Sequence, residues 1–237
     1  MEKIKVTDIR ALRRAIEGGS CVEKVVWRKG APPPPSLWEL IKKHRIPFQQ
    51  VPSSELQPGH TWCAYLSPLS LYTAAHLLEA SPSGVALALI GVTDPRNVGA
   101  ICRNAAAFGV EWILLRAEGS PLLSNDALWR ASAGTLPLLK IIRELRPISA
   151  LKALQKKGWT LAATVSPRRE AIPYWAWDWL QPSILLIGAE GEGLPSDYER
   201  ICQVHLTIPH KREVESLNVS SATALFLAEY YRRVFNR

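Results

Sequence analysis

The sequence predicts an α/β protein whose last two thirds form a mainly parallel sheet, preceded by a smaller α/β unit. One observation is the unbroken apolar run from Val85 to Ile90, typical of a strand buried on both faces of a parallel sheet. Another is that apolar runs alternate with helical patterns from there onward. The Ser-Pro-Ser-Gly cluster at 81–84 breaks the chain before this region. We therefore expect domains over 1–76 and 85–237, joined by a linker over 77–84.

The first unit alternates helix and strand. Its expected elements are a helix over 7–17, a strand over 23–27, an extended proline connector over 32–35, a helix over 36–45 and a strand over 48–51. Thr7 is the expected N-cap of the first helix, and Ser36 with Glu39 has the spacing of a capping box for the second. A further helical pattern covers 69–80 and leads into the linker.

The second unit supplies the elements of the parallel sheet. After the strand over 85–90, the expected strands cover 112–115, 161–165, 184–187 and 205–208. The expected helices cover 97–108, 125–133, 149–157 and 216–236. The last helix is apolar on more than one face, with Phe226 and Tyr230 on one side and Leu225 on another. Such a helix is either central to the core or shared with a second subunit.

Composition limits the class of protein. The chain has 237 residues, a net charge of +8, a pI near 9.5 and 47% hydrophobic residues. A basic excess favours a polyanionic partner, although charge alone fits a basic protein without one equally well. The four cysteines are scattered without metal-ligand spacing, so we expect no metal site. We find no signal-peptide pattern and no uncharged stretch of membrane-spanning length, so we expect a cytoplasmic protein without membrane contact.

Polar residues at the start of the helix over 97–108 form the first candidate site motif. Asn97 and Gly99 follow the strand over 85–90, and open parallel sheets bind ligands at the carboxyl ends of their strands. Arg103 falls off the apolar stripe of the same helix. Taken alone, Arg103 fits a solvated surface residue. Its place beside Asn97 at a strand end makes it a candidate for chemistry.

A glycine-rich turn over 188–193 forms the second motif. It follows the apolar strand over 184–187, and such a turn lets the backbone approach a ligand and frees N–H groups to contact it. The turn lacks the GK[ST] of a phosphate-binding loop and the GxGxxG of a dinucleotide fold. Glu190 inside the turn suits orienting a cation or hydroxyl better than cradling phosphate. A plain surface turn is the alternative interpretation.

The third motif, Ser216-Leu217-Asn218, opens the last helix, after a short strand ending at Ile208-Pro209. Ser216 and Asn218 also fit simple helix caps. Taken in this order, the three motifs resemble those of the SpoU (TrmH-type) branch of the SPOUT RNA methyltransferases. Ser132-Ala133-Gly134 is similar to a further signature of that family.

The resemblance covers about residues 85–237 and implies several properties. The expected fold is a trefoil-knotted α/β methyltransferase domain that works as a homodimer, with sites built at the interface. The expected reaction is methyl transfer from S-adenosylmethionine to a ribose 2′-hydroxyl of RNA, with ribosomal RNA as the first choice of substrate and tRNA as the alternative. The first unit would correspond to the ribosomal-protein-like, RNA-binding domain of the family.

The resemblance also implies a role for each matching residue. The positions that would hold the cofactor, mostly through backbone, are Gly188, Ile208 and Leu217. The positions implied for catalysis are Arg103 at the 2′-hydroxyl, Asn97 assisting it, and Glu190, Ser216 and Asn218 completing the site. Arginine is a poor base at its normal pKa, so a role as base and a role as electrostatic guide both stay open.

One departure from the family pattern keeps other hypotheses open. The family usually reads Ile-Pro-Met-x-Gly before its third motif, whereas this chain has Ile208-Pro209-His210-Lys211-Arg212. The missing glycine and the added charge favour a second hypothesis, an RNA-binding homologue with weak or lost catalysis. A nucleotide-dependent oxidoreductase using the glycine-rich turn is a third.

Basic groups outside the motifs concentrate in the first unit, which favours that unit as the RNA platform. Each group singly fits a solvated face. The groups are Arg10, Arg13 and Arg14; Lys24, Arg28 and Lys29; Lys42, Lys43 and Arg45; and, in the second unit, Arg168 and Arg169.

Overall fold

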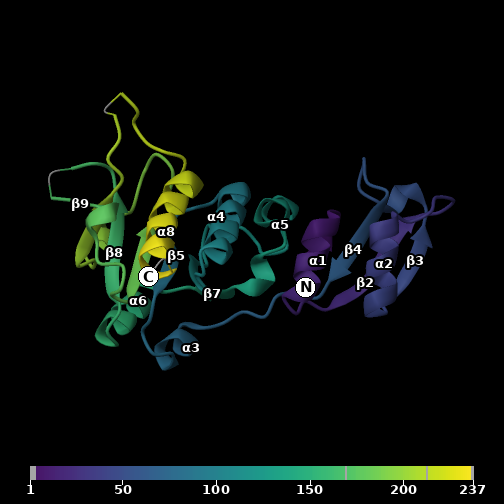
Figure 1. Cartoon of the computed structure of the whole chain (residues 1–237), viewed down its shortest axis with the longest axis horizontal. Coiled ribbons are helices and arrows are strands. Elements are labelled where there is room, and N and C mark those ends of the chain that lie inside the picture. The colour runs from purple at the N-terminus through teal and green to yellow at the C-terminus, as the bar shows by residue number, and fades with distance from the viewer. Residues whose placement is uncertain (1–3, 169, 212, 236–237) are drawn as a thin grey trace.

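The computed structural model describes residues 4–168, 170–211 and 213–235, and its strands form two sheets (Figure 1). The first sheet has the order β1-β4-β2-β3. Its strands are β1 (Ile4–Val6), β2 (Val22–Arg28), β3 (Phe48–Val51) and β4 (Trp62–Leu66). β3 runs parallel to β2, whereas β4 pairs antiparallel with β1 and β2. β3 is an edge strand, because it stands last in this order.

Helices α1 (Ile9–Glu17) and α2 (Pro35–His44) share a buried core with one face of this sheet, and both were expected near these bounds. The expected caps are wrong. The N-cap of α1 is Asp8, whose carboxylate accepts a hydrogen bond from the Ala11 amide at 2.9 Å, and not Thr7. α2 starts at a proline whose fixed φ suits the first helical turn, and the expected capping box of Ser36 and Glu39 does not form.

Two strands of the first sheet were not expected from the sequence. β1 is only three residues long, too short for its alternation to stand out from chance. β4 pairs with β1 and β2 at once, so its place depends on two partners distant in sequence. The opposite face of this sheet is covered by the segment that follows β3, through Leu56 packed on Val26 and Cys63.

The second sheet contains seven parallel strands in the order β7-β6-β5-β10-β8-β11-β9. The strands are β5 (Val85–Leu89), β6 (Trp112–Arg116), β7 (Lys140–Glu144), β8 (Thr160–Val165), β9 (Ile172–Pro173), β10 (Ser183–Ile187) and β11 (Val204–Thr207). The predicted parallel sheet is thus confirmed, with β5 and β10 buried along their whole length. The edge strands β7 and β9 were not expected.

Helices cover both faces of this sheet. The helices of this unit are α3 (Ala74–Glu79), α4 (Pro95–Ala107), α5 (Asp126–Ser132), α6 (Pro147–Lys156), α7 (Ser196–Glu199) and α8 (Val219–Phe235), and α5 packs on α4. It also has 3-10 turns at Leu136–Leu138 and Tyr174–Ala176, whereas the turn Ser53–Glu55 belongs to the first unit. α4 and α8 lie side by side over the face that carries Leu87 and Leu89, while α3 and α6 cover the face with Ala86 (Figure 1). The helix expected over 69–80 is shorter because Tyr72 pairs with Ile142 as an isolated bridge.

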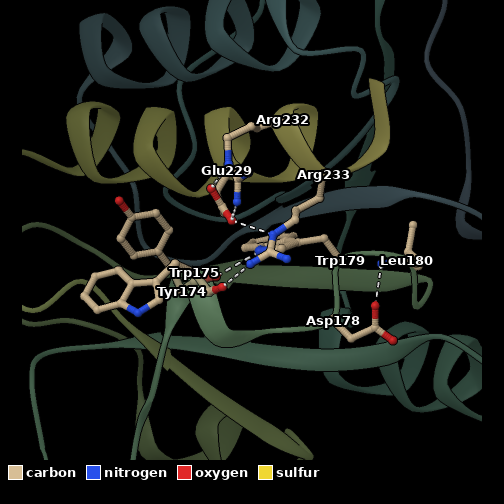
Figure 2. A network of polar contacts seen from close by, with 8 residues as sticks. All are labelled: Tyr174, Trp175, Asp178, Trp179, Leu180, Glu229, Arg232 and Arg233. Carbon is tan, nitrogen blue, oxygen red and sulfur yellow. Dashed lines mark hydrogen bonds and ion pairs between the residues drawn. The ribbon is translucent and has the colours of Figure 1, made fainter. Parts of the chain in front are cut away.

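The C-terminal end of α8 is tied to the loop between β9 and β10 (Figure 2). Glu229 accepts hydrogen bonds from Arg232 Nη2 at 2.6 Å and from Arg233 Nε at 2.8 Å. Arg233 Nη2 also donates to the backbone oxygen of Trp175 at 2.7 Å. This network holds the C-terminal end of α8 on that loop, and the third motif directly precedes the other end of the helix. Position 236 of the expected last helix lies outside the described residues.

The two units touch directly. Gly134 has a φ of +80°, and a Cβ there would collide with the backbone of Ala11 in α1. Gln57 Nε2 donates to Asp126 Oδ2 at 2.6 Å across the same junction. The Ser132-Ala133-Gly134 signature therefore serves the contact between units.

The domain limits and the knot stay predictions. Within the described ranges, no helix combines the length and apolar character that a membrane span requires.

Candidate active site

Three polar side chains, one from each motif, meet at the carboxyl edge of the second sheet. Asn97 stands at the start of α4, Glu190 in the loop after β10, and Asn218 directly before α8. Asn97 Nδ2 donates to Glu190 Oε2 at 3.2 Å. Asn218 Nδ2 donates to Asn97 Oδ1 at 3.1 Å and lies 3.4 Å from Glu190 Oε2. The structure thus joins segments that are far apart in the sequence into one cluster.

Asn218 fulfils both interpretations of its motif. Its Oδ1 accepts hydrogen bonds from the backbone of Ser220 at 3.1 Å and of Ser221 at 3.3 Å, as an N-cap does. Its Nδ2 meanwhile faces the cluster. The cap fixes the side chain, so the amide reaches the cluster in one orientation. Asn104 of α4 adds a bond to the backbone oxygen of Ser220 at 3.1 Å and holds the two helices together at this end.

The glycine-rich turn is a closed loop. The amides and carbonyls of Ala189 and Gly193 exchange hydrogen bonds of 3.0 Å in both directions. Gly188 lies against the backbone of Gly193 so closely that a Cβ would collide with it. Gly193 itself has a φ of +72°, in the left-handed region. The loop therefore needs glycine at both positions, and its closure projects Glu190 toward Asn97.

A cavity of about 360 Å³ adjoins this cluster. Gly188, Ile208 and Leu217, the three positions expected to hold a cofactor, all line it. Glu190 and Ser216 line it as well, whereas Asn97, Arg103 and Asn218 are not part of its wall. The structure therefore brings the expected cofactor positions around one space, and their role in binding stays a prediction.

Arg103 lies on the outer side of α4. Its side chain is exposed, and it forms no hydrogen bond or ion pair with any described residue. The stripe that faces the core is formed by Val98, Ile101, Cys102 and Ala105, as expected. Gly99, by contrast, serves packing: a Cβ there would collide with the backbone of α5. The guanidinium of Arg103 is thus free to meet a substrate.

Two charged side chains in the cavity wall were not identified as site residues. Arg168 Nη2 and Glu199 Oε1 form an ion pair of 2.7 Å, and both residues line the cavity. His205 Nε2 lies 3.5 Å from the same Glu199 oxygen. From the sequence, Arg168 stands out only as one of the basic surface residues. No spacing in the sequence indicates this pair, because it joins the loop after β8 to the short helix α7.

The departure at 210–212 also reaches the cavity. His210 lines the wall, and its Nδ1 lies 2.8 Å from the backbone oxygen of Ile208. Lys211 is exposed, while Arg212 and Arg169 lie outside the described residues.

Burial raises the pKa of the Cys102 thiol to about 12, so this cysteine of the first motif is not a ready nucleophile. No group of His, Cys, Asp and Glu suited to a metal ion occurs in the described ranges.

Known proteins share this architecture. The chain is 26% identical to a putative TrmH family tRNA/rRNA methyltransferase of Staphylococcus saprophyticus, over 98% of this chain and 97% of that protein. The structure of the SpoU methyltransferase AviRb from Streptomyces viridochromogenes with AdoMet superposes with a TM-score of 0.83 at 21% identity, covering 99% and 92% of the two chains. An RNA 2′-O ribose methyltransferase structure gives a TM-score of 0.78 at 25% identity, covering 98% and 88%. The model of the SpoU rRNA Methylase family matches residues 84–228, and the chain therefore belongs to that family.

Proposed function

We propose that this protein transfers a methyl group from S-adenosylmethionine to a ribose 2′-hydroxyl of ribosomal RNA in the cytoplasm. The observation that carries the proposal is the meeting of Asn97, Glu190 and Asn218 beside a cavity lined by Gly188, Ile208 and Leu217. Family membership supports RNA methylation in general. The similar structure described as a 2′-O ribose methyltransferase favours the ribose over the base as the methylated group.

The residues around the cavity fit S-adenosylmethionine. Phe226 and Val219 of α8 give the wall an apolar part, as an adenine ring requires. Glu190 and Glu192 line the same space and carry the charge that attracts a sulfonium and an ammonium group. Gly188 has no side chain to block the approach of a ligand to the backbone of the loop.

In the proposed reaction the cavity holds the cofactor and Arg103 acts on the ribose hydroxyl. When bound, S-adenosylmethionine supplies a methyl group on a positively charged sulfur. A ribose hydroxyl is a weak nucleophile and needs a partner that stabilises the developing alkoxide. We assign this role to Arg103, whose guanidinium has no partner among the described residues. Asn97 and Asn218 hold Glu190, and Ser216 completes the rim.

The departure at His210 favours one alternative, an RNA-binding homologue with weak or lost catalysis. His210 stands in the cavity wall, and the adjoining Lys211 adds a positive charge, which repels a sulfonium. Calorimetric titration separates the hypotheses. Binding of S-adenosylmethionine supports the enzyme, RNA binding without it supports the homologue without catalysis, and a preference for a dinucleotide supports an oxidoreductase.

A product analysis tests the reaction itself. The protein is incubated with labelled S-adenosylmethionine and either ribosomal RNA or tRNA, and the RNA is digested to nucleosides. We expect label in 2′-O-methyl nucleosides from ribosomal RNA. Label confined to a methylated base contradicts the assignment to ribose, and label confined to tRNA contradicts the choice of substrate.

A further inference from the structure

Three aromatic rings are in contact on the outer side of the first unit. Trp27 of β2 and Phe48 of β3 are stacked, with ring centroids 5.1 Å apart and planes inclined by 23°. Trp38 of α2 meets both rings edge-on, at 5.9 Å from Trp27 and 5.3 Å from Phe48. Trp27 is buried, whereas Phe48 is 52% exposed. The cluster thus begins inside the core and ends in a ring open to solvent.

The exposed ring is held in place on its inner side. Stacking on Trp27 and the edge of Trp38 restrict Phe48 without covering it. A single exposed apolar residue needs no explanation by itself. A rigid ring with one free side is different, because it offers a flat surface at low entropic cost. Its neighbours on the edge strand, Gln49 and Gln50, are also exposed and carry amides able to donate and accept hydrogen bonds.

The surroundings of this ring are cationic. Lys42, Lys43 and Arg45 at the end of α2 are exposed, and Lys42 Nζ lies 5.2 Å from the Trp38 ring centre. Arg28 and Lys29 are also exposed but lie farther along the sheet, since Val25 is the β2 partner of Phe48 and Arg28 is the partner of Val51. None of these five cations forms an ion pair with a described residue, and the sequence has no acidic residue from position 40 to 54. Their charge is therefore available to a polyanion.

We propose that this surface, formed by Phe48, Gln50, Lys42, Lys43 and Arg45 and here called the Phe48 face, binds unpaired nucleotides of the RNA substrate. A base stacks on the free side of Phe48 while the cations meet the adjoining phosphates. Stacked aromatics within a basic surface are how proteins hold single-stranded RNA. Bases of a duplex are already stacked on each other, so the Phe48 face selects unpaired segments. The inference rests on the proposed RNA substrate and adds where, and in what form, the RNA is held.

The test compares Phe48→Leu, Phe48→Tyr and the parent for binding to a single-stranded RNA oligonucleotide by fluorescence anisotropy. Leucine keeps apolar contact with Trp27 but removes the stacking surface, so we expect affinity to fall about tenfold, the lower range for one stacked base. Tyrosine keeps the ring and should restore parental affinity. Trp175→Leu is the matched control, because Trp175 is 47% exposed and lies in the second unit, on the loop that α8 anchors. It should bind RNA as the parent does.

Two further readouts define failure. Lys43→Gln should lower the slope of log affinity against log salt by about 0.7, the value for one phosphate contact on a single strand. Equal affinity of Phe48→Leu and the parent overturns the proposal, and so does an equal loss on a duplex. The proposal is also overturned if the parent binds a peptide strand at the free edge of β3 while the Phe48 variants leave RNA affinity unchanged. Methyl transfer by the parent is measured in parallel: its absence counts against the proposed reaction, whereas the Phe48 comparison concerns RNA binding alone.

Discussion

At the scale of single residues, Arg103 carries the sharpest prediction. Its side chain is exposed and unpaired, so Arg103→Ala should leave the free energy of unfolding within about 1 kcal/mol of the parent value. Cofactor binding should persist, because Arg103 is not part of the cavity wall. The kcat for methyl transfer at saturating RNA should fall about a hundredfold or more.

A matched variant makes the Arg103 measurement specific. Arg96 is exposed on the same helix, but it pairs with Asp94 at 2.8 Å. Arg96→Ala should therefore keep the parental kcat. Parental turnover in Arg103→Ala would show that Arg103 is a solvated surface residue without a catalytic role.

Gly188 gives a second prediction at this scale. In Gly188→Ala the new Cβ meets the backbone of Gly193, which cannot move without opening the Ala189–Gly193 pairing. We expect loss of S-adenosylmethionine binding in calorimetry and a free energy of unfolding lower by about 1–3 kcal/mol, the usual cost of overpacking. Gly191→Ala in the same loop meets open space and suffers only from its φ of +85°, so it should retain more binding. Equal binding by the two variants would contradict this explanation of the loop.

At the scale of elements, the network at the end of α8 makes stability depend on pH. The bonds from Arg232 and Arg233 lower the pKa of the Glu229 carboxyl from 4.5 to about 2 (Figure 2). Because the pKa is lower in the folded state, this stabilisation is complete above pH 4.5 and is lost as the pH falls toward 2. The difference in urea midpoint between Glu229→Gln and the parent should therefore be largest near neutral pH and shrink through this window. A difference independent of pH would show that Glu229 acts by packing.

The elements also show what the sequence can and cannot predict. β3 and β5 were expected almost as observed, because a continuous apolar run or a strand between clear breakers is a local signal. β1 and β7 were missed because a short or charged edge strand is defined by its partner. The site residues divide in the same way, into those with a local signal in the sequence and those brought together only by folding. Asn97, Glu190 and Asn218 stand at strand ends and helix starts, whereas the pair of Arg168 and Glu199 exists only through folding.

At the scale of the whole molecule, one face of α8 is largely exposed within the described part of the chain. α8 packs on α4 and on the segment before β10: the buried rings of Phe226 and Tyr230 meet Tyr174 and Trp179. Near its end, Tyr231 also meets Phe108, which follows α4, with ring centroids 6.0 Å apart. On its outer side, Leu225 and Tyr231 are each 39% exposed and Phe235 is 53% exposed. Together with Ala228 they fall on one stripe of the helix. We propose that this stripe is the contact of a homodimer, which agrees with the double apolar pattern expected from the sequence.

The oligomeric state follows as the last prediction. Light scattering of the parent at micromolar concentration should give twice the 26.3 kDa mass of one chain. Leu225→Arg places a charge in the middle of the stripe, where burial without a partner is costly, and should give the mass of a monomer. Leu145→Arg is the control: Leu145 is 72% exposed just beyond β7, far along the sheet from α8, and its substitution should leave the dimer intact. A parental protein that scatters as a monomer would contradict the proposed interface. Helix α4, which carries Arg103, packs beside α8. If the dimer forms as expected, Leu225→Arg should therefore lower methyl transfer together with the mass, while Leu145→Arg changes neither.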